Sequence, residues 1–370
     1  MYLVTFSLSI GLLFYSERTK NKVMRRLLVM LALLVPSALA GLRDYSIGND
    51  VLLYGNTWFE NACSYDSLFS FLDKAHEYSI GIGYATVNWI ISRISHNPHV
   101  FYFFYELLQL TILYYVVKPL KNKISISFAF FVYYFSYYNL SLNLLRQIMA
   151  VLIILYAYRY IANKNIIKYI VAVLIAYSFH TTGIIGIVLY PISVSVESGK
   201  LKKIFRYLIV GCSVIFVIGY EQIFNLLINV NVLSATRYSH YLTDTDVGGR
   251  YIRLVYWGIV LFFVIWKGKK SNLQYENIIT LQMFMIISAI MSILTFVGST
   301  WVIRVAYYFD IYQVIYFAFL AQKLNIRLKV GQQKTLAGGY ILLGGLVIVN
   351  WLIVFIIRNG AATFPYVFMK

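Results

Sequence analysis

The stretch LAGGYILLGGLVIVNWLIVFII, residues 336–357, contains no charged side chain anywhere along its length. A helix of about 20 mainly apolar residues is long enough to cross the hydrocarbon core of a bilayer. Residues 278–297 form a second apolar run without a charge. Both runs predict transmembrane helices, and we expect the rest of the chain to be organised around a membrane.

The composition supports this expectation. Of the 370 residues, 60% are hydrophobic and only 12% are charged, with a mean hydropathy of +0.71. A soluble domain carries about 25% charged residues, so this chain cannot cover itself with a polar surface. The net charge of +18 also suits a nucleic-acid-binding protein. However, the basic residues lie in short clusters between apolar runs, which indicates membrane topology and no nucleic-acid partner.

The apolar ranges predict an all-α polytopic transmembrane bundle of about 12 spans. Each range is long enough, or nearly long enough, to cross the membrane as a helix. The weakest are the short first range and the pair that meets at residues 180–182. The expected spans are 1–16, 27–42, 100–117, 124–140, 143–161, 166–180, 181–196, 204–220, 252–266, 278–297, 304–322 and 336–357.

The orientation follows from the positions of Lys and Arg. Every second connection is basic, and these connections together hold 22 of the 32 basic residues. Because basic loops stay in the cytoplasm, both termini are expected outside. Residues 1–15 have neither a basic leader nor an A-x-A cleavage site, so we expect no cleavable signal peptide. The basic connections are 17–26, 118–123, 159–168, 197–206, 267–276 and 323–334.

Two long outer loops are expected between the spans of one integral membrane domain, 1–370. The larger, 43–98, contains the short apolar stretch 81–95. We interpret this stretch as an interfacial amphipathic helix, because a membrane span there would place the basic connection 118–123 outside the cytoplasm. The second outer loop is 221–251. Long loops of this kind are often functional.

The outer side carries an unusual excess of arginine. Eight of its ten basic residues are Arg, although Lys predominates in the cytoplasmic connections. The guanidinium fork binds phosphate or carboxylate at two points, whereas Lys acts as a point charge. Arg146 and Arg304 lie at or just inside the outer ends of spans, where burial is costly and points to function. Snorkelling to the interface is the alternative explanation. Arg43, Arg250 and Arg253 lie at helix–loop junctions.

Few other residues suggest chemistry. His180 lies between two spans and is a candidate base, phosphate donor or structural cap. Asp50 lies in the acidic outer loop, and Glu106 and Asp310 lie within spans, where they need a partner. Cys63 and Cys212 lie in unlike surroundings, so we expect neither a disulfide nor a metal site. No G-x-S-x-G, Walker A or dinucleotide motif is present.

Two blocks carry a family resemblance. Residues 145–150 read LRQIMA and residues 176–182 read AYSFHTT. They resemble the R-Q-x-x-A and F-H-x-[ST] patterns of the EpsG family of Wzy-like bacterial polysaccharide polymerases, which includes O-antigen and capsule polymerases. Residues 48–54 (GNDVLLY) are similar to the family's G-x-D…Y segment. Glu77 with the later Gly83-Tyr84 resembles its E-x-G-Y at a longer spacing, and Arg304 with Tyr307 and Tyr308 resembles its late R-x-x-x-Y.

The resemblance implies a glycosyltransferase that needs no metal or cofactor and polymerises surface polysaccharide such as the O-antigen of lipopolysaccharide. Donor and acceptor are oligosaccharide repeats on undecaprenyl pyrophosphate, at the periplasmic face of the bacterial inner (cytoplasmic) membrane. Membrane lipids and a chain-length regulator protein are further expected partners. The implied catalytic residues are Arg146, His180 and Arg304. The substrate-binding residues that we expect beside them are Arg43, Asp50, Gln147, Arg250, Arg253 and Tyr307.

The chemistry of this reaction fits those residue types. Departure of pyrophosphate develops negative charge, which preorganised Arg stabilises, so we expect Arg146 and Arg304 to hold the diphosphate. The acceptor hydroxyl needs a base, for which both His180 and Asp50 remain candidates. A flippase of lipid-linked sugars would need charges through the membrane depth or repeated halves. A membrane acyltransferase acting on polysaccharide would need a partner beside His180. Both stay alternatives.

Overall fold

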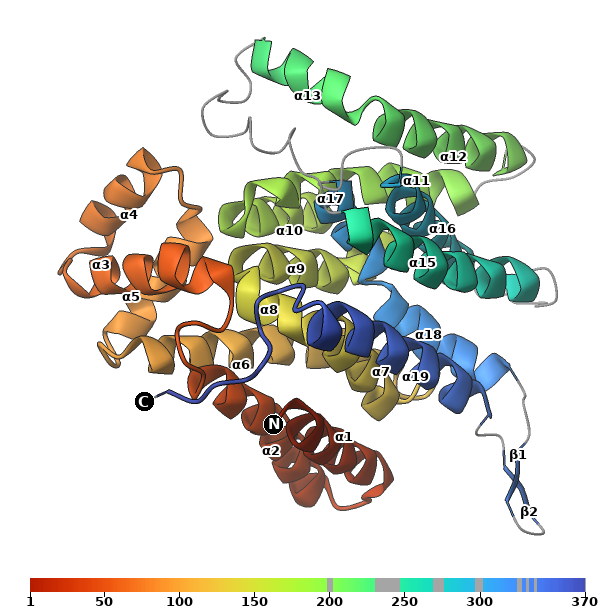
Figure 1. The fold of residues 1–370 in the computed structure, drawn as a ribbon, viewed down its shortest axis with the longest axis horizontal. Coiled ribbons are helices and arrows are strands. Elements are labelled where there is room, and N and C mark those ends of the chain that lie inside the picture. The colour runs from red at the N-terminus through yellow and green to blue at the C-terminus, as the bar shows by residue number, and fades with distance from the viewer. Residues whose placement is uncertain are drawn as a thin grey trace. The chain divides into compact units, whose positions relative to one another are not determined.

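The computed structural model describes residues 1–197, 202–229, 247–268, 276–296, 302–324, 328–330, 333–335 and 338–369. The chain divides into two compact units, which we describe separately. Unit 1 comprises Met1–Tyr160, Ile167–Ile184 and Phe317–Lys370, and unit 2 comprises Ile161–Ile166 and Ile185–Tyr316. Both units are built from helices (Figure 1), so the predicted all-helical fold class is confirmed.

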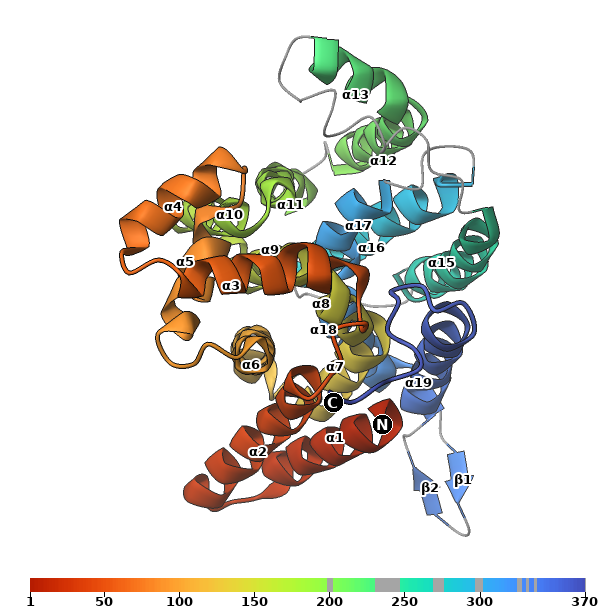
Figure 2. The same cartoon turned by 60° about the vertical axis from the view of Figure 1, so that its left-hand side comes forward.

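Unit 1 begins with a helical hairpin in which α1 (Tyr2–Arg18) packs along α2 (Lys22–Gly41), as Figure 2 shows. Helix α2 also packs on α6. The other elements of this unit are η1 (Val51–Asn56), α3 (Thr57–Cys63), α4 (Leu68–Glu77), α5 (Ile82–Ser92), α6 (Pro98–Val117), η2 (Lys118–Leu120), α7 (Ile126–Tyr133), η3 (Tyr134–Tyr138), α8 (Asn139–Asn143), α9 (Leu145–Ala162), α10 (Ile166–Phe179), the strands β1 (Leu328–Val330) and β2 (Gln333–Thr335), α19 (Gly338–Trp351) and η6 (Leu352–Ile357).

Unit 2 is organised around one central helix. α16 (Glu276–Leu294) packs against α15, α17, α12 and α11. The segments η4 and α18 each begin in one unit and end in the other. The remaining elements are η4 (Thr181–Val188), α11 (Leu189–Glu197), α12 (Lys202–Ile218), α13 (Tyr220–Asn229), α15 (Val247–Gly268), α17 (Val302–Asp310) and α18 (Gln313–Lys323).

Within the described residues, every range predicted to span the membrane coincides with one helix or with consecutive helices; residues 297 and 336–337 of these ranges lie outside the described part. Five described segments are long and apolar enough to cross a membrane, and four apolar helices are shorter. The range 124–140 is divided among α7, η3 and α8, and 304–322 is divided between α17 and α18. The count of twelve crossings therefore stays a prediction. The five long segments are Lys22–Gly41, Pro98–Leu120, Leu145–Ala162, Gly249–Trp266 and Gly338–Ile357.

The large outer loop predicted over 43–98 contains more helices than the one expected. The interfacial helix predicted over 81–95 corresponds to α5, but η1, α3 and α4 precede it. α3 and α4 both pack on α5, with Trp58 and Phe71 buried between them. These short helices depend on aromatic burial and not on a long apolar run, so hydropathy did not predict them. In the second outer loop, α13 is seen, and residues 230–246 lie outside the described part.

Buried tyrosines make up much of the interior of unit 1. The ring of Tyr134 stacks on Phe6 with centroids 5.0 Å apart, and its hydroxyl bonds with Ser9 at 2.7 Å. Tyr138 donates to the Pro36 carbonyl. A buried hydroxyl without a partner is costly, so each such bond fixes how two helices meet.

The C-terminal segment after η6 folds back over the start of the outer loop. Arg43 forms an antiparallel backbone bridge with Phe368, and the Asp44 amide donates to the Val367 carbonyl at 2.9 Å. The Tyr2 hydroxyl donates to the Thr363 carbonyl at 2.7 Å. This segment therefore covers the first residues of the loop that carries Asp50.

Candidate active site

A break in the helical chain places Arg146 at the start of a helix. α8 ends at Asn143, Leu144 has non-helical backbone angles (φ −86°, ψ 52°), and α9 begins at Leu145. The carbonyls of a last helical turn lack intrahelical donors and need other partners. Arg146, the second residue of α9, is therefore near the positive end of a helix, which favours an anion nearby.

Side chains from elsewhere in unit 1 hold this break. The Arg43 Nη1 donates to the Leu142 carbonyl at 2.7 Å. From α6, the Tyr105 hydroxyl and the Gln109 Nε2 each lie 3.3 Å from the Leu145 carbonyl. All three side chains are buried. Because these donors satisfy carbonyls on both sides of Leu144, they fix the position of Arg146 through its backbone.

The outer loop is fastened to the same break. The Asp50 amide donates to the Asn143 Oδ1 at 3.0 Å. Gly48 has φ +95°, and a Cβ there would lie 2.9 Å from the Leu142 carbonyl oxygen, so a side chain would be strained and crowded. The Gly48-Asn49-Asp50 turn therefore requires glycine, and it leads directly into η1, which carries Tyr54.

Arg146 lies against two tyrosine rings. Its guanidinium carbon is 4.3 Å from the ring centroid of Tyr54 and 5.7 Å from that of Tyr84. Arginine in this position gains a cation–π attraction through its planar face while its N–H edge remains a donor. The side chain is half-buried, and among the described residues no acceptor hydrogen-bonds its guanidinium. The group is thus positioned by the rings and keeps its donors for an anion.

Electrostatic effects on Tyr84 link these residues. Burial raises the pKa of this phenol, which lies outside the long apolar helices, to about 12. Arg146 and Arg43 act to lower it, and Asp50 acts to raise it. All three charges are therefore within electrostatic range of the Tyr84 hydroxyl.

His180 lies at the same end of unit 1 as Arg146. α9 ends at Ala162 and α10 begins at Ile166, so the two helices run antiparallel, and the start of α9 and the end of α10 share one end. The α5 helix meets α10 here. A Cβ on Gly81 would lie 2.2 Å from the Ser178 carbonyl oxygen, and one on Gly83 would lie 2.9 Å from the Phe179 ring. The chain of contacts thus runs from Arg146 through Tyr84 to the residues before His180.

The imidazole of His180 closes a local turn. Its Nδ1 lies 2.7 Å from the Thr182 hydroxyl and accepts the Thr182 amide at 3.2 Å. Because Nδ1 accepts from the backbone, a neutral ring carries its proton on Nε2. The structural cap proposed from sequence is therefore present.

Of the other sequence candidates in unit 1, Arg43 and Gln147 are buried. Arg43 is 0% exposed, lies 4.2 Å over the Tyr102 ring, and has no partner for Nε or Nη2 among the described residues. Gln147 is 2% exposed beside Arg146. Glu106 accepts from the Ser141 hydroxyl at 2.9 Å, so its hydrogen-bond partner is a serine.

The remaining candidates form a second group within unit 2. Arg250 and Arg253 lie in the first turns of α15, and Arg304 and Tyr307 lie in α17. The Arg253 Nε lies 3.3 Å from the Thr295 hydroxyl, just after α16. Arg304 and Arg253 are both within electrostatic range of the Tyr307 hydroxyl. The sequence candidates thus gather into one cluster in each unit.

Several residues of the site were not assigned a role from sequence. Tyr54 and Tyr84 lie inside motifs that were quoted, but nothing there showed that both rings contact Arg146. Tyr105 and Gln109 lie in an apolar run. The only sequence signal for Gln109 is that an amide at that depth needs a hydrogen-bond partner.

Comparison with known proteins gives a family for the chain. The model of the EpsG family matches residues 26–368, nearly the whole length. No curated protein and no solved structure matches.

Proposed function

We propose, from the premise that this chain belongs to the EpsG family, that it polymerises oligosaccharide repeats carried on undecaprenyl pyrophosphate. The family indicates a membrane polysaccharide polymerase-like protein. The substrate, the mechanism and the face of the membrane are our proposal. The observation that carries it is the Arg146 guanidinium, which is stacked against Tyr54 and Tyr84 and has no protein acceptor among the described residues.

Arg146 has the chemistry that a leaving diphosphate needs. Cleavage of the bond between the sugar and the pyrophosphate places negative charge on the departing oxygen, and preorganised donors lower that barrier. The tyrosine rings and the start of α9 hold the guanidinium before substrate arrives, so little reorganisation is needed. Arg43 acts indirectly, because it donates a hydrogen bond to the Leu142 carbonyl and so positions the helix break that precedes Arg146.

Two groups share the proton chemistry in this proposal. The Nδ1 of His180 accepts the Thr182 amide and is not placed to act as the base, so we assign the imidazole to binding a phosphate oxygen. We therefore assign the base to Asp50, whose backbone is fixed by Asn143 and which is partly buried. The base would remove the proton of the acceptor hydroxyl as that oxygen attacks the anomeric carbon.

The second arginine cluster suits the same ligand class. Polymerisation brings together two lipid-linked substrates, and each carries a diphosphate. We assign Arg304 and Arg253, with Arg250 and Tyr307, to diphosphate binding in unit 2. The orientation predicted from the basic loops puts both clusters at the extracytoplasmic face of the bacterial cytoplasmic membrane.

The test is deletion of the gene followed by electrophoresis of the surface polysaccharide. Loss of the long ladder with retention of single anchored repeats supports a polymerase. Loss of all surface repeats supports a flippase, and an unchanged ladder supports an acyltransferase. Either result overturns the proposal.

The site assignment is tested by complementation at matched protein levels. Arg146→Ala, His180→Ala and Asp50→Asn should each fail to restore the ladder. Arg18→Ala serves as the control, because Arg18 also lies over an aromatic ring, that of Phe14, but is exposed in α1. Full ladders from all three site variants would refute the assignment.

A further inference from the structure

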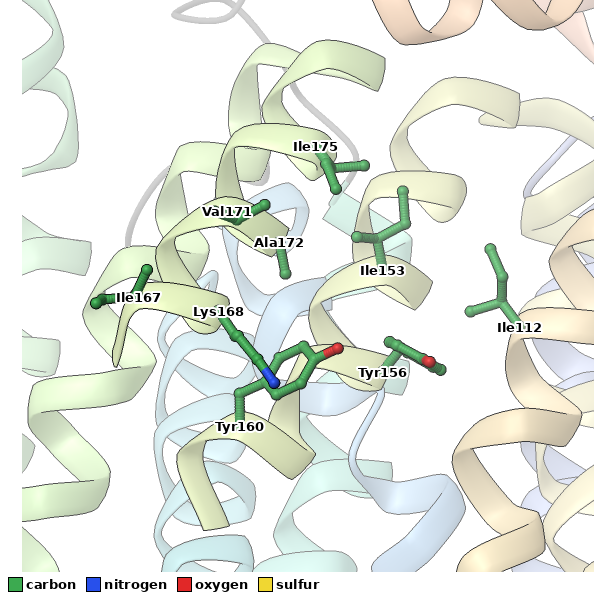
Figure 3. Close-up of a pocket in the computed structure, with 9 residues that line it drawn as sticks. All are labelled: Ile112, Ile153, Tyr156, Tyr160, Ile167, Lys168, Val171, Ala172 and Ile175. Atoms are coloured by element: carbon green, nitrogen blue, oxygen red, sulfur yellow. The ribbon is translucent and has the colours of Figure 1, made fainter. Parts of the chain in front are cut away.

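A pocket of about 370 Å³ opens between α6, α9 and α10 of unit 1. Its volume lies within the range of small-ligand sites. Figure 3 shows that its upper part is formed by aliphatic side chains, among them Ile112, Ile153 and Ile175. The lower part holds Lys168 with Tyr160 and Tyr156. The pocket is therefore apolar with one polar, cationic end.

The two ends are separated along the helices. Ile153 and Tyr160 lie seven residues apart on α9, which corresponds to about 10 Å of helix. Lys168 and Ile175 have the same spacing on α10, in the antiparallel direction. Each helix thus places a polar residue, Tyr160 or Lys168, at one end and an isoleucine at the other, although Ile167 lies next to Lys168. This division matches a molecule with an apolar chain and a polar head.

The charge at the polar end is positive. The guanidinium of Arg159 lies 3.7 Å over the Tyr156 ring and donates to the Tyr115 carbonyl at 2.7 Å. None of the residues that line the pocket is acidic. Lys168 is exposed, so its stem can lie along the apolar wall while its ammonium reaches the membrane surface. An anionic head group complements this end, and a head group that also carries a positive charge complements it less.

The surroundings of the pocket are those of a lipid-facing surface. Val171 and Ile175 of α10 are about half exposed, at 50% and 48%, and Ile167 is 74% exposed. Lys168 and Arg159 belong to the basic connection 159–168, which the sequence places on the cytoplasmic side. The polar end is therefore expected at the level of the inner-leaflet phosphates, where anionic lipids attract basic side chains.

We propose that this pocket binds one anionic phospholipid of the cytoplasmic leaflet. One acyl chain lies between α6, α9 and α10, and the phosphate lies beside Lys168. The site is separate from the Arg146 cluster, which is at the opposite end of α9, and it does not depend on the polymerase proposal.

The test uses the full-length protein in detergent and native mass spectrometry. Phosphatidylglycerol and phosphatidylcholine with identical acyl chains are titrated separately. The wild type should bind phosphatidylglycerol more tightly, and Lys168→Gln should weaken that binding about fivefold while leaving phosphatidylcholine binding unchanged. Lys121→Gln, an exposed lysine of another basic connection, is the charge-matched control and should bind both lipids like the wild type.

A second variant tests the apolar part. Ala172 lines the pocket and is 6% exposed. The larger side chain in Ala172→Leu should fill part of the pocket and weaken the binding of both lipids. Equal affinity of the wild type for the two lipids would overturn the proposal, as would an equal loss in Lys121→Gln. Binding of undecaprenyl phosphate that Lys168→Gln and Ala172→Leu weaken more than they weaken phosphatidylglycerol binding would assign the pocket to a different occupant and also overturn the proposal.

Discussion

Adding one methyl group where α5 meets α10 should disable the candidate active site. Gly81 has φ −62° and ψ 134°, which alanine adopts without strain, so the effect of Gly81→Ala comes from contact alone. The new Cβ would lie 2.2 Å from the Ser178 carbonyl oxygen, whereas ordinary contacts begin at 3.4 Å. The two backbones must therefore separate by about 1.2 Å.

This separation acts on both sides of the site. It moves Tyr84, three residues after Gly81, away from Arg146, and it shifts the turn that carries His180. A misplacement of about 1 Å costs on the order of 10²-fold in rate. Overpacking also destabilises by about 1–3 kcal/mol, so activity must be expressed per molecule of folded protein.

The assay is the polysaccharide ladder from complemented deletion cells, with the protein quantified in the membrane fraction. Gly11→Ala is the matched control, because no atom of the described residues lies within 4 Å of a Cβ there. It should leave the ladder unchanged, since alanine is the better helix former. A normal ladder from Gly81→Ala at wild-type abundance would refute the close approach of α5 and α10 as a requirement of the site.

Three other predictions test separate parts of the account. Arg146→Lys keeps the charge but loses the planar fork, so the polymerisation rate in proteoliposomes should fall at least tenfold, to roughly the level of Arg146→Ala; wild-type rates would contradict the stacked geometry. Gln109→Leu removes a hydrogen-bond donor to the Leu145 carbonyl and should lower the stability of the folded protein by about 1–3 kcal/mol. Thermal unfolding measures this change, and an unchanged melting temperature would contradict it. Burial raises the pKa of the Cys63 thiol, with Arg93 partly opposing it. Because the thiolate is the reactive form, maleimide labelling in a Cys212→Ser background should need a higher pH than labelling of free cysteine, and equal rates at neutral pH would argue against the burial.

Hydropathy located the helices of the predicted spans, but it did not predict the short helices η1, α3 and α4 or the conformation of the interruptions. The range 143–161 was correctly expected to be helical, because apolar residues continue through it. The boundary predicted between the spans 124–140 and 143–161 lies close to the break at Leu144. The conformation of the break was not predicted, since it is stabilised by donors from Arg43 and Gln109, which are distant in sequence. The same break positions Arg146. The feature that matters most to the candidate site thus depends on tertiary hydrogen bonds.

The burial of Arg43 shows the same limit. Its position at a helix–loop junction made it a candidate to bind substrate, a prediction that stays open. In the structure, its strand partner is Phe368, more than 300 residues away, and the C-terminal segment covers it. The residues around Arg43 in the sequence do not predict such a contact. His180 is a contrasting case, since its capping of Thr182 is local and was among the sequence alternatives.

The central claim is that the Arg146 guanidinium stabilises a departing diphosphate. The direct measurement is the rate of undecaprenyl pyrophosphate release by full-length Arg146→Ala protein in proteoliposomes, supplied with a lipid-linked single repeat. We predict a rate lower by about 10²–10³-fold, partly restored by added guanidinium ion, while Arg18→Ala releases product at the wild-type rate. Release by Arg146→Ala as fast as by the wild type, without guanidinium, would contradict the claim.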